Sequence, residues 1–66
     1  MAYISTKKGL QTLLQRLEDL KGGDKFQDYA YWVSCVRGCI DEGLAMDEID
    51  YENAPDWFRP LWRGLK

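Results

Sequence analysis

The sequence predicts an all-α protein: an antiparallel two-helix hairpin followed by a short, proline-interrupted C-terminal helical segment. Two stretches of apolar residues have the spacing of amphipathic helices, and the adjacent glycines Gly22 and Gly23 separate them. Two prolines, Pro55 and Pro60, divide the aromatic tail that follows. We treat residues 1–66 as a single small helical domain, because the chain has no internal repeat, low-complexity run or flexible linker.

The first helix is expected between Ser5 and Gly22. Leucines recur there at intervals of three and four residues, which places five of them on one face: Leu10, Leu13, Leu14, Leu17 and Leu20. Ser5 or Thr6 is a suitable N-cap, and the Gly22-Gly23 pair allows the positive φ with which helices commonly end. We interpret the leucines as core rather than as a zipper for a partner helix, since a coiled coil needs more heptads.

A second helix is expected from about Lys25 to Glu42. Asp24, followed three residues later by Gln27, has the form of a capping box, and Gly43 is placed to end the helix. Because the connection to the first helix is short, the two helices should run antiparallel. The face expected to meet the leucines carries Phe26, Tyr29, Val33, Val36 and Ile40, with Trp32 and Cys39 beside them.

After Gly43 the chain becomes acidic and aromatic, and seven of its eleven acids lie in residues 41–56. Asp47 is a candidate N-cap for a short helix that residues 53–55 must end. Pro55 is placed to begin another turn, and Pro60 to interrupt that turn or begin a last one. The apolar side chains of this tail are expected to cover one end or side of the hairpin: Trp57, Phe58, Leu61 and Trp62.

The composition argues against several classes of active site. Histidine is absent, so the commonest general base and the commonest nitrogen ligand for metals are missing. Cys35 and Cys39 are interpreted as reduced, small buried hydrophobic residues, because a structural zinc site needs four ligands and the chain has no histidine to activate a thiol. The acidic segment also lacks the glycine-centred loop of an EF-hand. We therefore expect no enzyme, no cofactor and no metal site.

The charge balance argues against nucleic acid as a partner. Nine Lys and Arg against eleven Asp and Glu give a net charge of −2. The order of helix, Gly43 turn and short helix is similar to a helix-turn-helix, but the second helix would open with Asp47-Glu48-Ile49-Asp50 and place carboxylates against phosphates. No stretch approaches the roughly 20 apolar residues of a membrane span, and no signal-like apolar segment follows the first lysines. We expect a cytoplasmic protein.

Residues 47–58 combine acids with aromatic side chains, a pattern that suits a positively charged protein partner. The candidate contact residues are Asp47, Glu48, Asp50, Tyr51, Trp57 and Phe58. Two alternatives stay open: the acids form a merely solvated face, and Trp57 belongs to the core. The hypothesis is a non-enzymatic interaction protein, an inhibitor or adaptor of the phage or mobile-element type, that occludes a basic surface.

A homodimer is a second expectation. At about 1.5 kcal/mol per ordered residue, folding must offset roughly 100 kcal/mol of conformational entropy, so the core of so short a chain is thin. Small residues recur every four positions on the second helix, with an aromatic beside them, and would let another helix approach: Ala30, Ser34 and Gly38, with Tyr31. Other readings are an unremarkable exposed face, a small structural homo-oligomer, or an accessory subunit of a larger enzyme.

Overall fold

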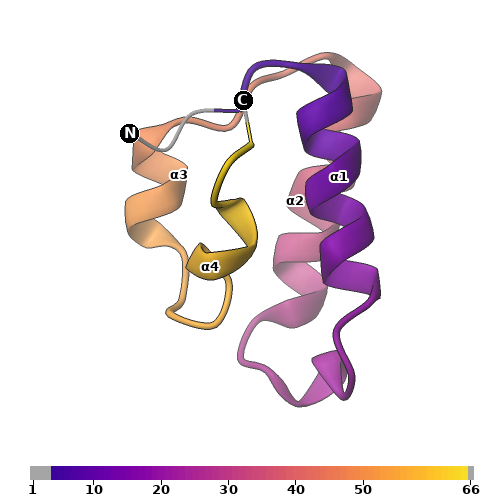
Figure 1. The fold of residues 1–66 in the computed structure, drawn as a ribbon, viewed down its shortest axis with the longest axis vertical. Coiled ribbons are helices and arrows are strands. Elements are labelled where there is room, and N and C mark those ends of the chain that lie inside the picture. The colour runs from indigo at the N-terminus through magenta and orange to yellow at the C-terminus, as the bar shows by residue number, and fades with distance from the viewer. Residues whose placement is uncertain (1–3, 66) are drawn as a thin grey trace.

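The computed structural model describes residues 4–65 and confirms the predicted all-α fold. Figure 1 shows α1 and α2 side by side and antiparallel, with α3 and α4 together on one side of this hairpin. Residues 4–65 contain no strand, only an isolated backbone pairing of Ile4 with Met46. The elements in chain order are α1 (Lys7–Glu18), the 3₁₀ turn η1 (Gly23–Lys25), α2 (Tyr29–Glu42), α3 (Glu48–Asn53) and α4 (Arg59–Trp62).

Helix α1 begins as the sequence predicts and ends earlier. The Thr6 side chain caps it by accepting a hydrogen bond from the Gly9 amide at 3.0 Å. The helix ends at Glu18 instead of reaching Gly22, whose φ of 66° belongs to the connection that follows. The leucine face is turned inward: Leu10, Leu13 and Leu17 are buried, while Leu14 and Leu20 are partly buried against the same core.

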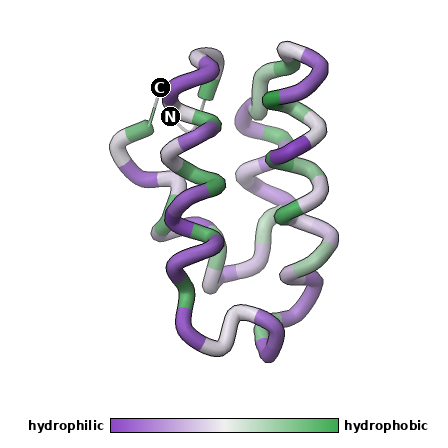
Figure 2. The backbone as a smooth tube through the Cα atoms, turned by 90° about the vertical axis from the view of Figure 1, so that its right-hand side faces the viewer, coloured by the Kyte–Doolittle hydropathy of each residue, from purple (hydrophilic) through white to green (hydrophobic). Residues whose placement is uncertain are grey.

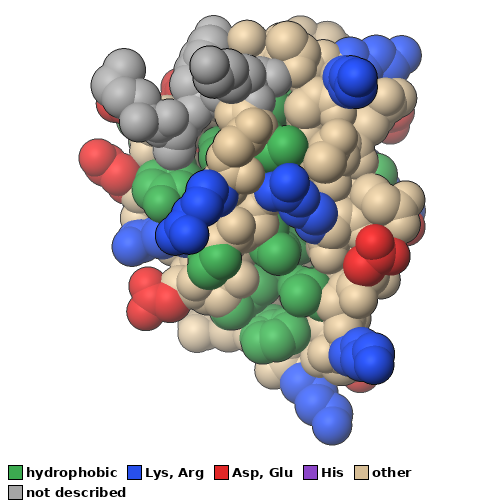
Figure 3. Space-filling view, viewed as in Figure 1, with side chains coloured by type: hydrophobic (Ala, Val, Ile, Leu, Met, Phe, Trp, Pro, Cys, Tyr) green, Lys and Arg blue, Asp and Glu red, His purple; other side chains and the backbone are tan. Residues whose placement is uncertain are grey.

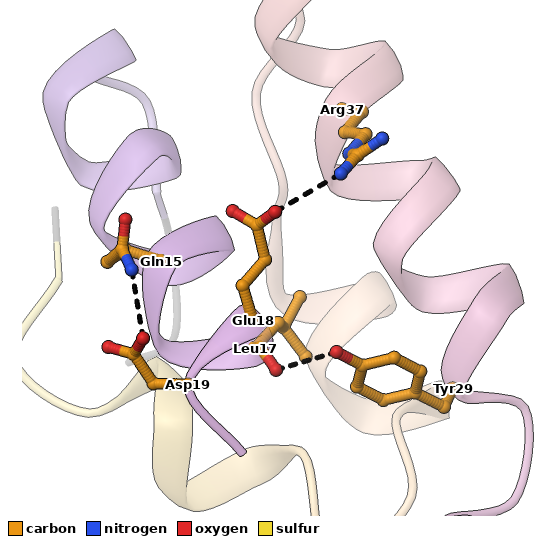
Figure 4. Close-up of polar contacts among 6 residues, drawn as sticks. All are labelled: Gln15, Leu17, Glu18, Asp19, Tyr29 and Arg37. Carbon is orange, nitrogen blue, oxygen red and sulfur yellow. Dashed lines mark hydrogen bonds and ion pairs between the residues drawn. The ribbon is translucent and has the colours of Figure 1, made fainter. Parts of the chain in front are cut away.

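Helix α2 starts at Tyr29, so the predicted start at Lys25 and the Asp24 capping box are wrong. A 3₁₀ turn and an extended Phe26 occupy this stretch instead. The cause is tertiary, because the Tyr29 ring packs on Gly23, where an added Cβ would lie 2.6 Å from a ring carbon. The Tyr29 hydroxyl also donates a hydrogen bond to the Leu17 carbonyl at 2.7 Å (Figure 4). A helix running on from Lys25 would not fold the chain back onto α1 in this way.

The two long helices are held by packing rather than by charge. Apolar segments recur along both helices in Figure 2, and buried Val36 and Trp32 of α2 share one core with the leucines. The ion pair between Glu18 and Arg37, 3.2 Å long, joins two exposed side chains (Figure 4). Such surface pairs contribute at most about 1 kcal/mol, so the apolar face dominates.

The connection from α2 to α3 confirms the predicted end of one helix and start of the next. Gly43 ends α2 with a φ of 70°. Asp47 caps α3, its carboxylate accepting from the Ile49 and Asp50 amides at 3.0 and 3.2 Å. The Asp50 carboxylate accepts from the Asp47 amide at 3.0 Å and completes a capping box. A helix of only 6 residues is thus stabilised at its first turn.

The aromatic tail fills the centre of the molecule. Phe58 is 0% exposed, and its ring centroid lies 5.0 Å from that of Trp32 and 5.6 Å from that of Trp62. Phe58 thus covers the hairpin as the sequence predicts, and its side chain is enclosed by the core instead of being exposed for the expected partner contact. Arg16 of α1 holds the tail by donating to the Leu61 and Arg63 carbonyls at 2.8 and 3.0 Å.

Truncation of Leu17 tests this packing. Leu17 is 0% exposed, so Leu17→Ala should lower the free energy of unfolding by about 2 to 5 kcal/mol, a large share of the stability of a small domain. Thermal melting followed by circular dichroism measures the loss. Leu44→Ala is the matched control, because Leu44 is 54% exposed and should barely change the melting temperature. Equal melting of the two variants would contradict the described core.

Candidate functional site

The acidic and aromatic residues predicted as one contact surface are divided by the fold. Asp50 faces a groove between α2 and α3, whereas Glu48 and Tyr51 line a separate hollow beside Trp62. Tyr51 is partly buried, with its ring edge-on to Trp62 at 5.5 Å. Asp47 is exposed and caps α3. The six residues therefore do not form a single patch.

Trp57 packs the C-terminal tail against the connection between α1 and α2. Its ring stacks on Phe26 with centroids 5.1 Å apart and lies 6.0 Å from Tyr29. Its Nε1 donates a hydrogen bond to the Gln27 carbonyl at 3.0 Å. These contacts join the tail to the turn between α1 and α2, so Trp57 has a structural role whether or not a partner also touches it.

An open groove of about 840 Å³ runs between the outer face of α2 and the α3 segment. Asp28 lies just before α2, and four more of the lining residues recur along the helix at intervals of three and four: Tyr31, Cys35, Gly38 and Glu42. That spacing gives a continuous stripe along one helical face. The opposite wall and the ends come from the loop after α2 and from α3: Leu44, Met46, Asp50, Asn53 and Pro55.

The groove is rimmed by acids. Its described lining includes Asp28, Glu42 and Asp50 and contains no Lys or Arg. The two ion pairs formed within residues 4–65, Arg37 with Glu18 and Arg59 with Asp56, involve none of these three carboxylates. Basic side chains are instead spread over the face formed by α1 and α4, which Figure 3 shows.

Two side chains in the groove have a raised pKa, to which the carboxylates make a secondary contribution. Interaction with the Cys35 side chain raises the pKa of the Tyr31 hydroxyl most, and the carboxylates of Asp50 and Asp28 raise it further. Burial raises the pKa of the Cys39 thiol, with Asp50 again adding to the effect. Both groups are therefore neutral at physiological pH, and both thiols are free.

Two of the four residues predicted for self-association line the groove. Tyr31, 62% exposed, and Gly38 line it, while Ala30 and Ser34 are exposed beside it. An added Cβ on Gly38 would meet nothing within 4 Å, so the fold does not need glycine there. The homodimer itself stays a prediction.

Sequence reasoning missed the other groove residues on α2 and just before it: Asp28, Cys35, Cys39 and Glu42. A signal was present, since Asp28, Tyr31, Cys35, Gly38 and Glu42 repeat at helical spacing opposite the core stripe. The position of α3 beside this stripe had no comparable signal, because it depends on contacts distant in the sequence.

No group of three or more His, Cys, Asp or Glu side chains within residues 4–65 is arranged to hold a metal ion. The helices of this part of the chain are too short and too polar to cross a membrane. Comparisons with protein-family models, with curated proteins and with solved structures found no match.

Replacement of Trp57 by phenylalanine tests whether its contacts stabilise the fold. Trp57→Phe keeps an aromatic ring but removes the hydrogen bond to Gln27, which should cost about 1 kcal/mol and lower the melting temperature by about 4 to 8 °C. Tyr31→Phe is the control, since it removes a polar atom from an exposed ring and should change melting far less. A Trp57→Phe variant that melts like the unaltered protein would contradict the structural role.

Alkylation of Cys39 tests the electrostatics of the groove. With Cys35→Ser leaving Cys39 as the single thiol, its reaction with iodoacetamide should rise with pH at values above those of free cysteine, because a raised pKa lowers the thiolate fraction at any given pH. Adding Asp50→Asn should move the pH midpoint down, whereas Asp41→Asn, outside the groove lining, should not. A midpoint at or below that of free cysteine would contradict the raised pKa.

Proposed function

We propose that this chain is a non-enzymatic interaction protein whose acid-rimmed groove binds a positively charged surface of a partner protein. The observation that carries the proposal is the charge of the groove: three carboxylates, from Asp28, Glu42 and Asp50, with no Lys or Arg in the described lining. A cationic partner surface would be attracted to carboxylates of one sign placed around the opening. The exposed ring of Tyr31 supplies an apolar anchor between the acids.

The thiols in the groove support a binding role over a catalytic one. A nucleophilic cysteine needs a lowered pKa or an adjacent base, and the pKa of Cys39 is raised. The sequence contains no histidine that could act as that base. We accordingly assign Cys35 and Cys39 to the groove wall.

The mode of action we propose is occlusion. A chain of 66 residues that covers a basic patch blocks whatever else binds there, which is how an inhibitor or adaptor of the phage or mobile-element type would act in the cytosol. A symmetric dimer through the groove would bring the acids of two copies together, so charge favours a different protein as the partner.

Affinity capture from a lysate of the source cells tests this function with two matched triple variants. The groove variant Asp28→Asn, Glu42→Gln, Asp50→Asn removes three charges and preserves shape. Asparagine tolerates the left-handed backbone of residue 28, where φ is 60°. The side-chain oxygen of asparagine at position 50 can still accept the hydrogen bond of the capping box. The control variant removes three exposed acids outside the groove lining: Asp24→Asn, Asp41→Asn and Glu52→Gln.

The unaltered protein and the control variant should both capture one basic protein in a defined ratio, and the groove variant should lose about nine-tenths or more of it. Raising the salt concentration should weaken capture, since exposed charges are screened. Equal capture by the groove and control variants, or a captured partner without a basic surface, would refute the proposed function.

A further inference from the structure

We infer that the occupant of the groove is a basic amphipathic α-helix of the partner, about four turns long, with Lys or Arg at both of its ends. This inference rests on the proposed function and adds the form in which the partner is recognised. It follows from the walls, the floor and the distribution of charge in the groove.

The walls favour a helix over an extended segment. A partner strand would gain affinity by pairing with an exposed sheet edge, and residues 4–65 offer none. The long wall is instead helical and follows α2, a helix of 14 residues that is about 20 Å long, while α3 contributes Asp50 and Asn53 to the facing wall. A helix of about four turns has that length and would lie along the wall.

The floor and walls allow close approach along that length. Trp32 and Met46, 7% and 1% exposed, contribute apolar atoms to the lining. At Gly38 the α2 backbone has no side chain, and a Cβ placed there would have no neighbour within 4 Å. A partner side chain can therefore reach the α2 backbone at this point, as at other helix contacts that use small residues.

The carboxylates are placed at the ends of the groove and across from its long wall. Asp28 precedes the first residue of α2 and Glu42 is the last, so the two lie about 20 Å apart along the helix. Asp50 faces them from α3. A docked helix would satisfy this arrangement with cations at both ends and an apolar face between them, which contacts Tyr31 and Cys35.

Selection from a displayed library of random peptides of about 16 residues tests the inference without knowledge of the partner. The unaltered protein is the target, and Gly38→Leu, which fills the groove, is used to discard peptides that bind elsewhere. The enriched sequences should repeat apolar residues every three and four positions and carry Lys or Arg at both ends. A synthetic peptide of the enriched sequence should become helical in circular dichroism when the protein is added.

Binding of that synthetic peptide by fluorescence anisotropy supplies the control. Gly38→Leu should weaken binding about tenfold or more, with no fall in melting temperature because the site is open. Ala30→Leu, an exposed small residue of α2 outside the groove lining, should leave binding unchanged.

Other outcomes would overturn the inference. Enriched peptides of alternating, extended pattern, or no enrichment relative to Gly38→Leu, would exclude a helix as the occupant. A dimer in analytical ultracentrifugation that Gly38→Leu dissociates would make the occupant a second copy of the chain. If the helix fails while the groove-acid variant still loses its captured protein, the proposed function stands and only the form of recognition is wrong.

Discussion

Burial of Phe58 and Trp62 against the hairpin is the interaction on which the rest of this structure depends. Two amphipathic helices packed together leave apolar surface that neither helix can cover. Without the tail, the side chains of Trp32 and Val36 of α2 would be partly exposed to solvent. Phe58, at 0% exposure, and Trp62, at 1%, close that surface. The gain is large because aromatic side chains bury more area than any others.

The position of the tail decides where α3 lies. Ala54 at the end of α3 is 3% exposed and belongs to the same core, so the helix is anchored at its C-terminal end. At the other end, Met46 pairs with Ile4 through two backbone hydrogen bonds of 2.8 and 3.0 Å. Helix α3 is thus held beside α2 from both ends, and the groove occupies the space left between them.

The arginines stabilise the fold, whereas three of the carboxylates line the groove. Arg16 and Arg59 donate to backbone carbonyls of the tail and of α3, and Arg37 pairs with Glu18. These arginines are engaged away from the groove, which leaves its carboxylates unopposed by internal cations. Asp50 serves both purposes, since it completes the capping box of α3 and contributes negative charge to the groove.

The acids and aromatics of the tail show why a surface is harder to predict than an element. Residues 47–58 are contiguous in the sequence, and their composition indicated one contact patch. The chain turns twice within this stretch, after Asn53 and again at Pro55. Consequently, Asp50 lines the groove and Tyr51 lines a separate hollow, whereas Phe58 is buried in the core.

The sequence by itself determined the helical fold, the inward face of α1 and the caps at Thr6, Gly43 and Asp47, because spacing and capping act over a few neighbouring residues. Tertiary structure alone decided the late start of α2 and the groove. Each of these depends on side chains far apart in the chain, such as the Tyr29 hydroxyl on the Leu17 carbonyl. Local propensity is weak, and distant contacts of this kind override it.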